Sequence, residues 1–108
     1  MSLKSVLIVL TRSKDPDRED EWRQWYDEVH IPHVMETQTL GLVETNRFEN
    51  AGAAPDEPRS LAIYEMDRDP VAVFDEMKAR MDKRRAEGNT YSIDCNDVMH
   101  INTYRRIF

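Results

Sequence analysis

The sequence predicts an α+β domain in which a four-stranded antiparallel sheet carries two helices on one face. Three observations predict this fold class. Four short segments are rich in β-branched and apolar residues, and two longer segments repeat their apolar residues at helical spacing. These segments follow one another as strand, helix, strand, strand, helix, strand. A chain of 108 residues has the length of one domain, so we treat residues 1–108 as a single unit.

The first strand is predicted over residues 5–12, SVLIVLTR. Its two alternating sets of side chains are both apolar, since Val6 and Ile8 on one side are followed by Leu7 and Val9 on the other. A strand of this kind is covered on both faces.

The first helix is predicted from about residue 16 to about residue 30. Asp15 followed by Pro16 is typical of an N-cap with proline at the first helical position. We expect the helix to bend or restart near Pro32, because proline removes a backbone hydrogen bond inside a helix. Gly41 should end this segment.

Three further strands and one helix complete the prediction. Strands are expected at 42–49 (LVETNRFE), 59–66 (RSLAIYEM) and 98–108 (VMHINTYRRIF), with a turn-rich connection between the first two. The second helix should begin at Asp69 and Pro70 and end at Gly88. Its buried stripe is predicted from apolar residues at helical spacing: Val73, Phe74, Met77 and Met81.

This order of elements is that of the ferredoxin-like split βαβ fold. Two helices cover only one face of a four-stranded sheet, yet the first and third strands are apolar on both faces. We therefore expect a second copy of the chain to cover the open face, in a homodimer packed sheet to sheet.

Composition excludes several classes of partner. The formal net charge is −6, from 21 acidic and 15 basic residues, which argues against nucleic acid and anionic membranes as partners. The basic cluster at 78–85, KARMDKRR, is typical of the solvated face of a helix. No segment approaches the roughly 18 apolar residues of a membrane span, and we expect a cytoplasmic protein. The single cysteine, Cys95, lies near Asp94 and Asp97, which disfavour a reactive thiolate.

The stretch WYDEVHIPH at 25–33 holds the main candidates for chemistry. Tyr26 and His30 are four residues apart, so they are neighbours on a helical face and could exchange a proton near neutral pH. Trp22 and Trp25 offer flat surfaces to an aromatic or apolar ligand. The alternative is that these aromatic residues are core, and both hold if the core is partly hollow.

His30 and His33 also raise the question of a metal site, as a pair three residues apart. Pro32 disturbs the turn between them and no strong third ligand is close in sequence, so we expect no metal and no bound cofactor. A bend at Pro32 would free the carbonyl of Glu28 and leave space between helix and sheet, which predicts a pocket here.

Arg47 and His100 are candidates for holding a substrate oxygen. Arg47 could bind a carboxylate or a carbonyl oxygen, or form a surface ion pair instead. His100 is expected on one face of the last strand, together with Val98, Asn102 and Tyr104. That mixed face suits a cavity wall or a wet dimer interface, and the alternative for His100 is a hydrogen-bonded structural role.

WYDEVHIPH, followed by a glycine-containing turn and a strand reading VETNRFE, resembles the EthD-like branch of the dimeric α+β barrel proteins. Tyr26, His30 and Pro32 meet the Tyr-x-x-x-His-x-Pro pattern of that branch, whereas His33 stands outside it. The resemblance implies a dimer whose two sheets form a barrel, with a pocket in each subunit between helices and sheet. The superfamily includes cofactor-free monooxygenases, polyketide cyclases, lactone isomerases and haem-binding enzymes, so the fold alone does not define the reaction.

The function we expect is that of a small-molecule enzyme without a bound cofactor, in a catabolic or secondary-metabolic pathway. It would isomerise, cyclise or oxygenate an apolar or aromatic substrate by proton transfer. The residues expected to act are His30 as base or acid with Tyr26 assisting, Trp22, Trp25 and His33 lining the pocket, and Arg47 or His100 holding a substrate oxygen. A ligand-binding or accessory protein without catalysis is the alternative, and haem or metal binding through His30 or His33 is a third possibility.

Overall fold

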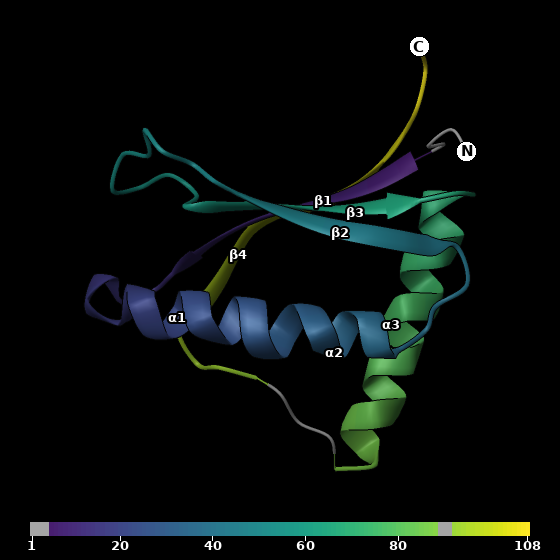
Figure 1. The fold of residues 1–108 in the computed structure, drawn as a ribbon, viewed down its shortest axis with the longest axis horizontal. Coiled ribbons are helices and arrows are strands. Elements are labelled where there is room, and N and C mark those ends of the chain that lie inside the picture. Colours follow the sequence, from purple (N-terminus) through teal and green to yellow (C-terminus); the bar gives the residue numbers. More distant parts are fainter. Residues whose placement is uncertain (1–4, 89–91) are drawn as a thin grey trace.

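The predicted order of elements and the four-stranded sheet are confirmed in a computed structural model, which describes residues 5–88 and 92–108 (Figure 1). The strands are β1 (Ser5–Ser13), β2 (Leu42–Glu49), β3 (Ser60–Met66) and β4 (Asn96–Arg105). Their order in the sheet is β2-β3-β1-β4, and every neighbouring pair is antiparallel. This is the ferredoxin-like α+β arrangement. Part of the predicted loop before β4, at 89–91, lies outside the described residues.

The first helical segment forms one rod that crosses the sheet (Figure 1). It consists of a 3-10 turn (Pro16–Arg18), α1 (Glu19–Trp25), a π-helical turn (Tyr26–His30), which we call the π turn, and α2 (Ile31–Glu36). The side chain of Asp15 accepts a hydrogen bond from the backbone N–H of Asp17, which confirms the predicted N-cap.

The restart predicted near Pro32 is present, because α2 begins at Ile31 directly after the π turn, with Pro32 at its start. The chain stays helical across this junction. The N–H of Ile31 donates to the carbonyl of Tyr26, five residues earlier, so the turn before Pro32 is one residue wider than an α-helical turn. A wide turn accommodates a proline ring that would otherwise press on the carbonyl of Glu28, four residues before it. Pro32 thus follows the point where the helix changes from π-helical to α-helical hydrogen bonding.

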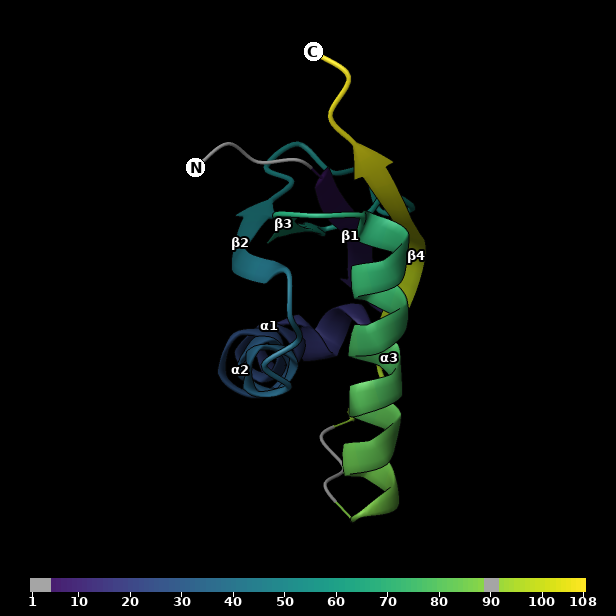
Figure 2. The same ribbon diagram turned by 90° about the vertical axis from the view of Figure 1, so that its right-hand side faces the viewer.

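The core lies between the sheet and the helices, which occupy the same side of it (Figure 2). Side chains of β1 and β3 that point to this side are buried: Leu7, Val9, Thr11, Ala62, Tyr64 and Met66. The second long helix, α3 (Pro70–Ala86), buries Val73 and Met77 and packs Phe74 and Met81 against the core, as predicted. None of the described helices is both long and apolar enough to cross a membrane.

The other side of the sheet, which we call the open face, carries no helix. Its side chains come from the alternate positions of each strand, including Val6, Ile8, Leu10, Leu61, Ile63, Phe48 and Tyr104. The residues of β1 and β3 in this set are partly exposed, and Phe48 and Tyr104 are exposed. Both faces of the two central strands are thus apolar, as the sequence predicts.

A register shift in β4 changes the expected grouping around His100. The pairing with β1 slips between Leu10 and Thr11, so His100 pairs with Leu10 while Val98 pairs with Thr11. Because Leu10 and Thr11 point to opposite sides of the sheet, Val98 and His100 do so as well. The prediction that Val98 and His100 share a face is therefore wrong.

Candidate functional site

The π turn gathers three rings on one side of the first helix. The Trp25 and His30 rings stack with their centroids 5.0 Å apart, and the Tyr26 ring meets His30 edge to face at 5.0 Å. The Tyr26 contact was expected from the spacing of four. Residues five apart on an α-helix lie about 140° from one another around the axis, so the Trp25 contact depends on the wider π turn.

His30 is held as a neutral imidazole at neutral pH. Its pKa is lowered to about 4, first by burial and then by the positive charges of His33 and Arg47. A neutral ring has a nitrogen lone pair that can accept a proton, and its conjugate acid returns that proton readily.

Tyr26 belongs to the core, and it is a phenol rather than a phenolate. Burial raises its pKa, against the opposing effects of the Thr11 hydroxyl and the Arg47 charge. Burial and the neighbouring Tyr26 likewise raise the pKa of Tyr64 well above its usual range. Tyr26 of the π turn therefore lies next to two buried hydroxyl groups of the sheet, those of Tyr64 and Thr11. Of these three residues, only Tyr26 was predicted as a site residue from the sequence.

Arg47 projects from β2 toward the helical side of the sheet. Its guanidinium lies 4.1 Å from the centroid of the Tyr26 ring and 5.8 Å from that of Trp22, which are cation–π contacts. Its Nε donates to the Ser60 hydroxyl at 3.1 Å, and a terminal nitrogen pairs with the carboxylate of Asp27. Tyr26 contacts both Arg47 and His30, so it connects the charge on β2 with the imidazole on the helix.

A pocket of about 180 Å³ opens beside Arg47, and we call it the Arg47 pocket. It is lined by Trp22, Arg23, Asp27, Arg47, Phe48, Glu49 and Arg59. Trp22 is fully buried and its indole N–H donates to Oδ1 of Asn96 at 2.9 Å, so this residue is both core and pocket wall. The interpretation of Trp22 as a core residue is confirmed, and its contact with a ligand stays a prediction.

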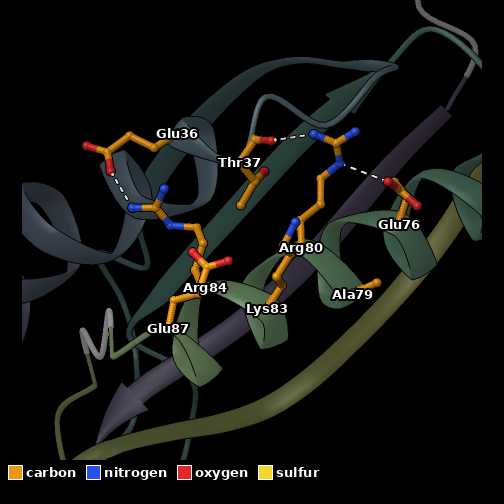
Figure 3. Close-up of a pocket in the computed structure, with 8 residues that line it drawn as sticks. All are labelled: Glu36, Thr37, Glu76, Ala79, Arg80, Lys83, Arg84 and Glu87. Atoms are coloured by element: carbon orange, nitrogen blue, oxygen red, sulfur yellow. Dashed lines mark hydrogen bonds and ion pairs between the residues drawn. The ribbon is translucent and has the colours of Figure 1, made fainter.

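His33 is buried on α2, and its surroundings differ from those of His30. Its pKa is lowered by burial and by the charge of Arg84, while Glu36 acts in the opposite direction. A groove of about 470 Å³ lies nearby, between the end of α2 and α3 (Figure 3). It is lined by Glu36, Thr37, Glu76, Ala79, Arg80, Lys83, Arg84 and Glu87, none of which was predicted as a site residue.

The charges in this groove are largely paired with one another. Arg84 bonds to Glu36 at 3.0 Å, and Arg80 bonds to Glu76 at 2.8 Å and to the carbonyl of Thr37 at 3.0 Å (Figure 3). The groove therefore ties α2 to α3 and stands apart from the rings of the π turn.

His100 is not brought together with the other candidates. It lies on the open face, where its Nε2 is 2.9 Å from the Tyr104 hydroxyl. Within one chain the sheet separates His100 from His30. Among residues 5–88 and 92–108, no three side chains of His, Cys, Asp or Glu form a group that could hold a metal ion.

No family model matches the chain, and no curated protein matches it either. Three solved structures are similar to it. A candidate monooxygenase from Shewanella loihica PV-4 is 23% identical, with a TM-score of 0.59, and the match covers 100% of this chain and 98% of that one. An EthD-like protein from Ralstonia eutropha JMP134 is 14% identical, with a TM-score of 0.58 and coverage of 100% and 96%.

The third is a dimeric ferredoxin-like protein of unknown function from Thermobifida fusca YX, 14% identical, with a TM-score of 0.55 and coverage of 98% and 93%. Each match spans nearly the whole of both chains, so the likeness concerns the complete fold. The resemblance to EthD-like proteins found in the sequence is thus confirmed at the level of the fold, and this chain has the ferredoxin-like α+β fold that those proteins share.

Proposed function

We propose that this protein is a small-molecule enzyme that moves a proton on an apolar or aromatic substrate, with His30 as the base. The observation that carries the proposal is the position of His30. A neutral imidazole stacks on Trp25, meets the buried phenol of Tyr26, and lies close enough to Arg47 for that charge to lower its pKa. A strongly perturbed pKa within a cluster of interacting rings is typical of functional sites.

The proposed step is the removal of a proton from an activated carbon next to a carbonyl group. The C–H bond breaks, the proton goes to His30, and the electron pair moves to the carbonyl oxygen to form an enolate. Arg47 holds an oxygen of the substrate, Trp25 and Trp22 present flat surfaces to its ring, and Tyr26 positions His30. Returning the proton to another carbon gives isomerisation, and attack by the enolate on a second carbonyl within the substrate gives cyclisation. Attack of the enolate carbon on molecular oxygen as co-reactant would form a peroxide that takes the proton from His30. Loss of water from this hydroperoxide would leave one oxygen atom on the substrate as a carbonyl.

A second candidate is binding of the same class of molecule without turnover. It is favoured by the low pKa of His30, because an imidazole of pKa about 4 is a weak base. In either case the EthD-like resemblance and the candidate monooxygenase of the same fold support a small organic ligand.

The two candidates are separated by proton exchange in heavy water. Aromatic 1,3-dicarbonyl compounds would be incubated with the protein, and loss of their acidic C–H signal followed by NMR. We expect exchange that His30→Gln slows by about 10²-fold or more, the usual contribution of a general base. Asp82→Asn, on the exposed surface of α3, should leave the rate unchanged. Shift changes without exchange would favour binding alone, and a fully active His30→Gln protein would overturn the role of His30.

We also propose that two copies of the chain pack through their open faces as a homodimer. The centre of the open face is apolar, from Ile8, Ile63, Leu10 and Leu61, and polar residues such as Glu65 surround it. Apolar patches with a polar rim mark interfaces. The Thermobifida fusca protein of the same fold is described as dimeric, which supports this proposal. In such a dimer His100 would lie at the interface.

A further inference from the structure

The Arg47 pocket brings together three arginines, each of which is paired with a carboxylate. Three guanidinium groups line it, from Arg23 on α1, Arg47 on β2 and Arg59 just before β3. Arg23 pairs with Glu49 at 2.5 Å and Arg59 with Glu19 at 3.3 Å. The third, Arg47, pairs with Asp27.

Arg47 differs from its neighbours in how firmly it is held. Its side chain is 17% exposed, against 35% for Arg23 and 41% for Arg59. The buried Ser60 hydroxyl accepts from its Nε, and the Tyr26 ring lies 4.1 Å from its guanidinium. A cation taken this far out of water needs an anionic partner, because an uncompensated buried charge is costly.

Asp27, the carboxylate that supplies this charge, has the opposite character. Its side chain is 63% exposed, and it extends from the outer side of the π turn into the pocket mouth. Returning such a carboxylate to water costs little when another anion takes its place on Arg47, because Asp27 itself is already largely hydrated. One partner of the pair is therefore fixed and the other is replaceable.

The rest of the pocket indicates what could replace it. The Trp22 ring, 5.8 Å from the guanidinium, is the flat apolar wall of the pocket, while Phe48 lines it from β2 with its side chain on the open face. The volume of about 180 Å³ is smaller than pockets for drug-sized ligands, which begin near 300 Å³. A planar carboxylate on a single aromatic ring fits both the wall and the fork of Arg47, which can donate two parallel hydrogen bonds.

We propose that the Arg47 pocket binds the carboxylate of a small aromatic acid, which displaces Asp27 from Arg47. If the protein is the enzyme proposed above, small aromatic acids are its substrate class. Only this assignment as substrate rests on the proposed function. Binding itself is a property of Arg47, Asp27 and the aromatic wall, and His30 takes no part in it.

The test uses benzoate as the probe, with binding followed by amide chemical shifts or calorimetry. Benzamide, a neutral molecule of the same shape, should bind at least about tenfold more weakly, as expected for the loss of a charge-assisted bidentate contact. Asp27→Asn should bind benzoate about fivefold more tightly, because the competing carboxylate is gone. Arg47→Gln should lose binding, and Arg47→Lys should recover only part of it, since lysine lacks the planar fork.

A matched control exists on α3, where Asp82 pairs with Arg85 at 3.0 Å on the exposed surface. Asp82→Asn removes the same charge from the chain and should leave benzoate affinity unchanged. Equal affinity of the Asp27→Asn and Asp82→Asn proteins for benzoate would overturn the displacement of Asp27 by the ligand. Equal binding of benzamide and benzoate would overturn carboxylate recognition. The His30→Gln protein should bind benzoate like the original chain, so a failure of the catalytic proposal is distinguished from a failure of this one.

Discussion

At the scale of single residues, protonation of His30 lowers the stability of the folded chain. Its pKa is about 4 in the folded chain against about 6.5 in an unfolded one, so the unfolded state takes up the proton first as the pH falls. The stability that neutral His30 contributes is present above pH 6.5 and is lost as the pH falls from there toward 4.

We therefore predict that His30→Gln weakens the dependence of stability on pH. The original chain should lose about 2 kcal/mol between pH 7.5 and pH 5 through this group, a figure from linkage, and the variant should lose correspondingly less. Urea denaturation at the two pH values measures the difference. The paired carboxylates, whose pKa values are lowered by arginines, act below this window: Glu21, Glu49, Asp69 and Asp94. An unchanged pH dependence in His30→Gln would contradict the burial of the imidazole.

The candidate site was only partly predictable from the sequence at this scale. The contact of Tyr26 with His30 follows from their spacing, which brings side chains together in either winding. Asp27 was missed as the partner of Arg47, since it lies 20 positions away in sequence and its side chain reaches β2 only after the rod has docked on the sheet. Contacts between elements depend on docking, which local spacing does not encode.

At the scale of elements, Gly41 shows where a turn and a helix approach most closely. It has a φ of +97°, and a Cβ at this position would meet Cδ of Arg68 and Cγ2 of Val73 at 2.8 Å. Gly88 has a similar φ of +90°, but no atom lies within 4 Å of such a Cβ. A side chain at Gly88 would cost backbone strain alone, whereas a side chain at Gly41 would cost backbone strain and steric clashes with Arg68 and Val73.

We predict that Gly88→Ala destabilises the protein by about 1 kcal/mol, the usual cost of a left-handed alanine. Gly41→Ala should cost about 1–3 kcal/mol more, because the added methyl group crowds Val73 on α3 and strains the start of β2. Denaturation midpoints of the two variants measure both terms. An equal loss of stability in the two variants would show that Arg68 and Val73 move aside at no energetic cost.

Strands were the most predictable elements, and the irregularities within elements were not predicted. Alternating apolar residues locate β2 at its observed bounds and β1 and β3 within one residue. The last strand, predicted at 98–108, is observed as β4 at Asn96–Arg105, so its predicted bounds are wrong at both ends. No residue marks the register slip in β4, whereas Pro32 marks the place of the π turn but not its form. A proline in a helix predicts a bend or a restart, and here it follows a turn wide enough to receive its ring.

At the scale of the whole molecule, the apolar centre of the open face is the feature on which the proposed homodimer rests. Ile8 and Ile63 pair at its centre, on the two middle strands of the sheet. A carboxylate placed there would be buried without a partner in a sheet-to-sheet dimer, at a cost of several kcal/mol.

We predict that the original chain sediments as a dimer at micromolar concentration and that Ile8→Asp sediments as a monomer. Val71→Asp, which changes an exposed apolar residue on α3, serves as the control and should remain dimeric. A monomeric original chain would sink the proposed homodimer. A dimeric Ile8→Asp protein would show that another surface holds the copies together.

The π turn has a consequence for how this chain is compared with others. It contains one residue more than the α-helical turn it replaces, so positions before and after it are offset by one relative to a regular helix. A sequence whose corresponding helix is regular aligns with this chain only if a one-residue gap is placed within Tyr26–His30. Without that gap, either Trp22 or His33 is matched to a position that points about 100° away from its true counterpart.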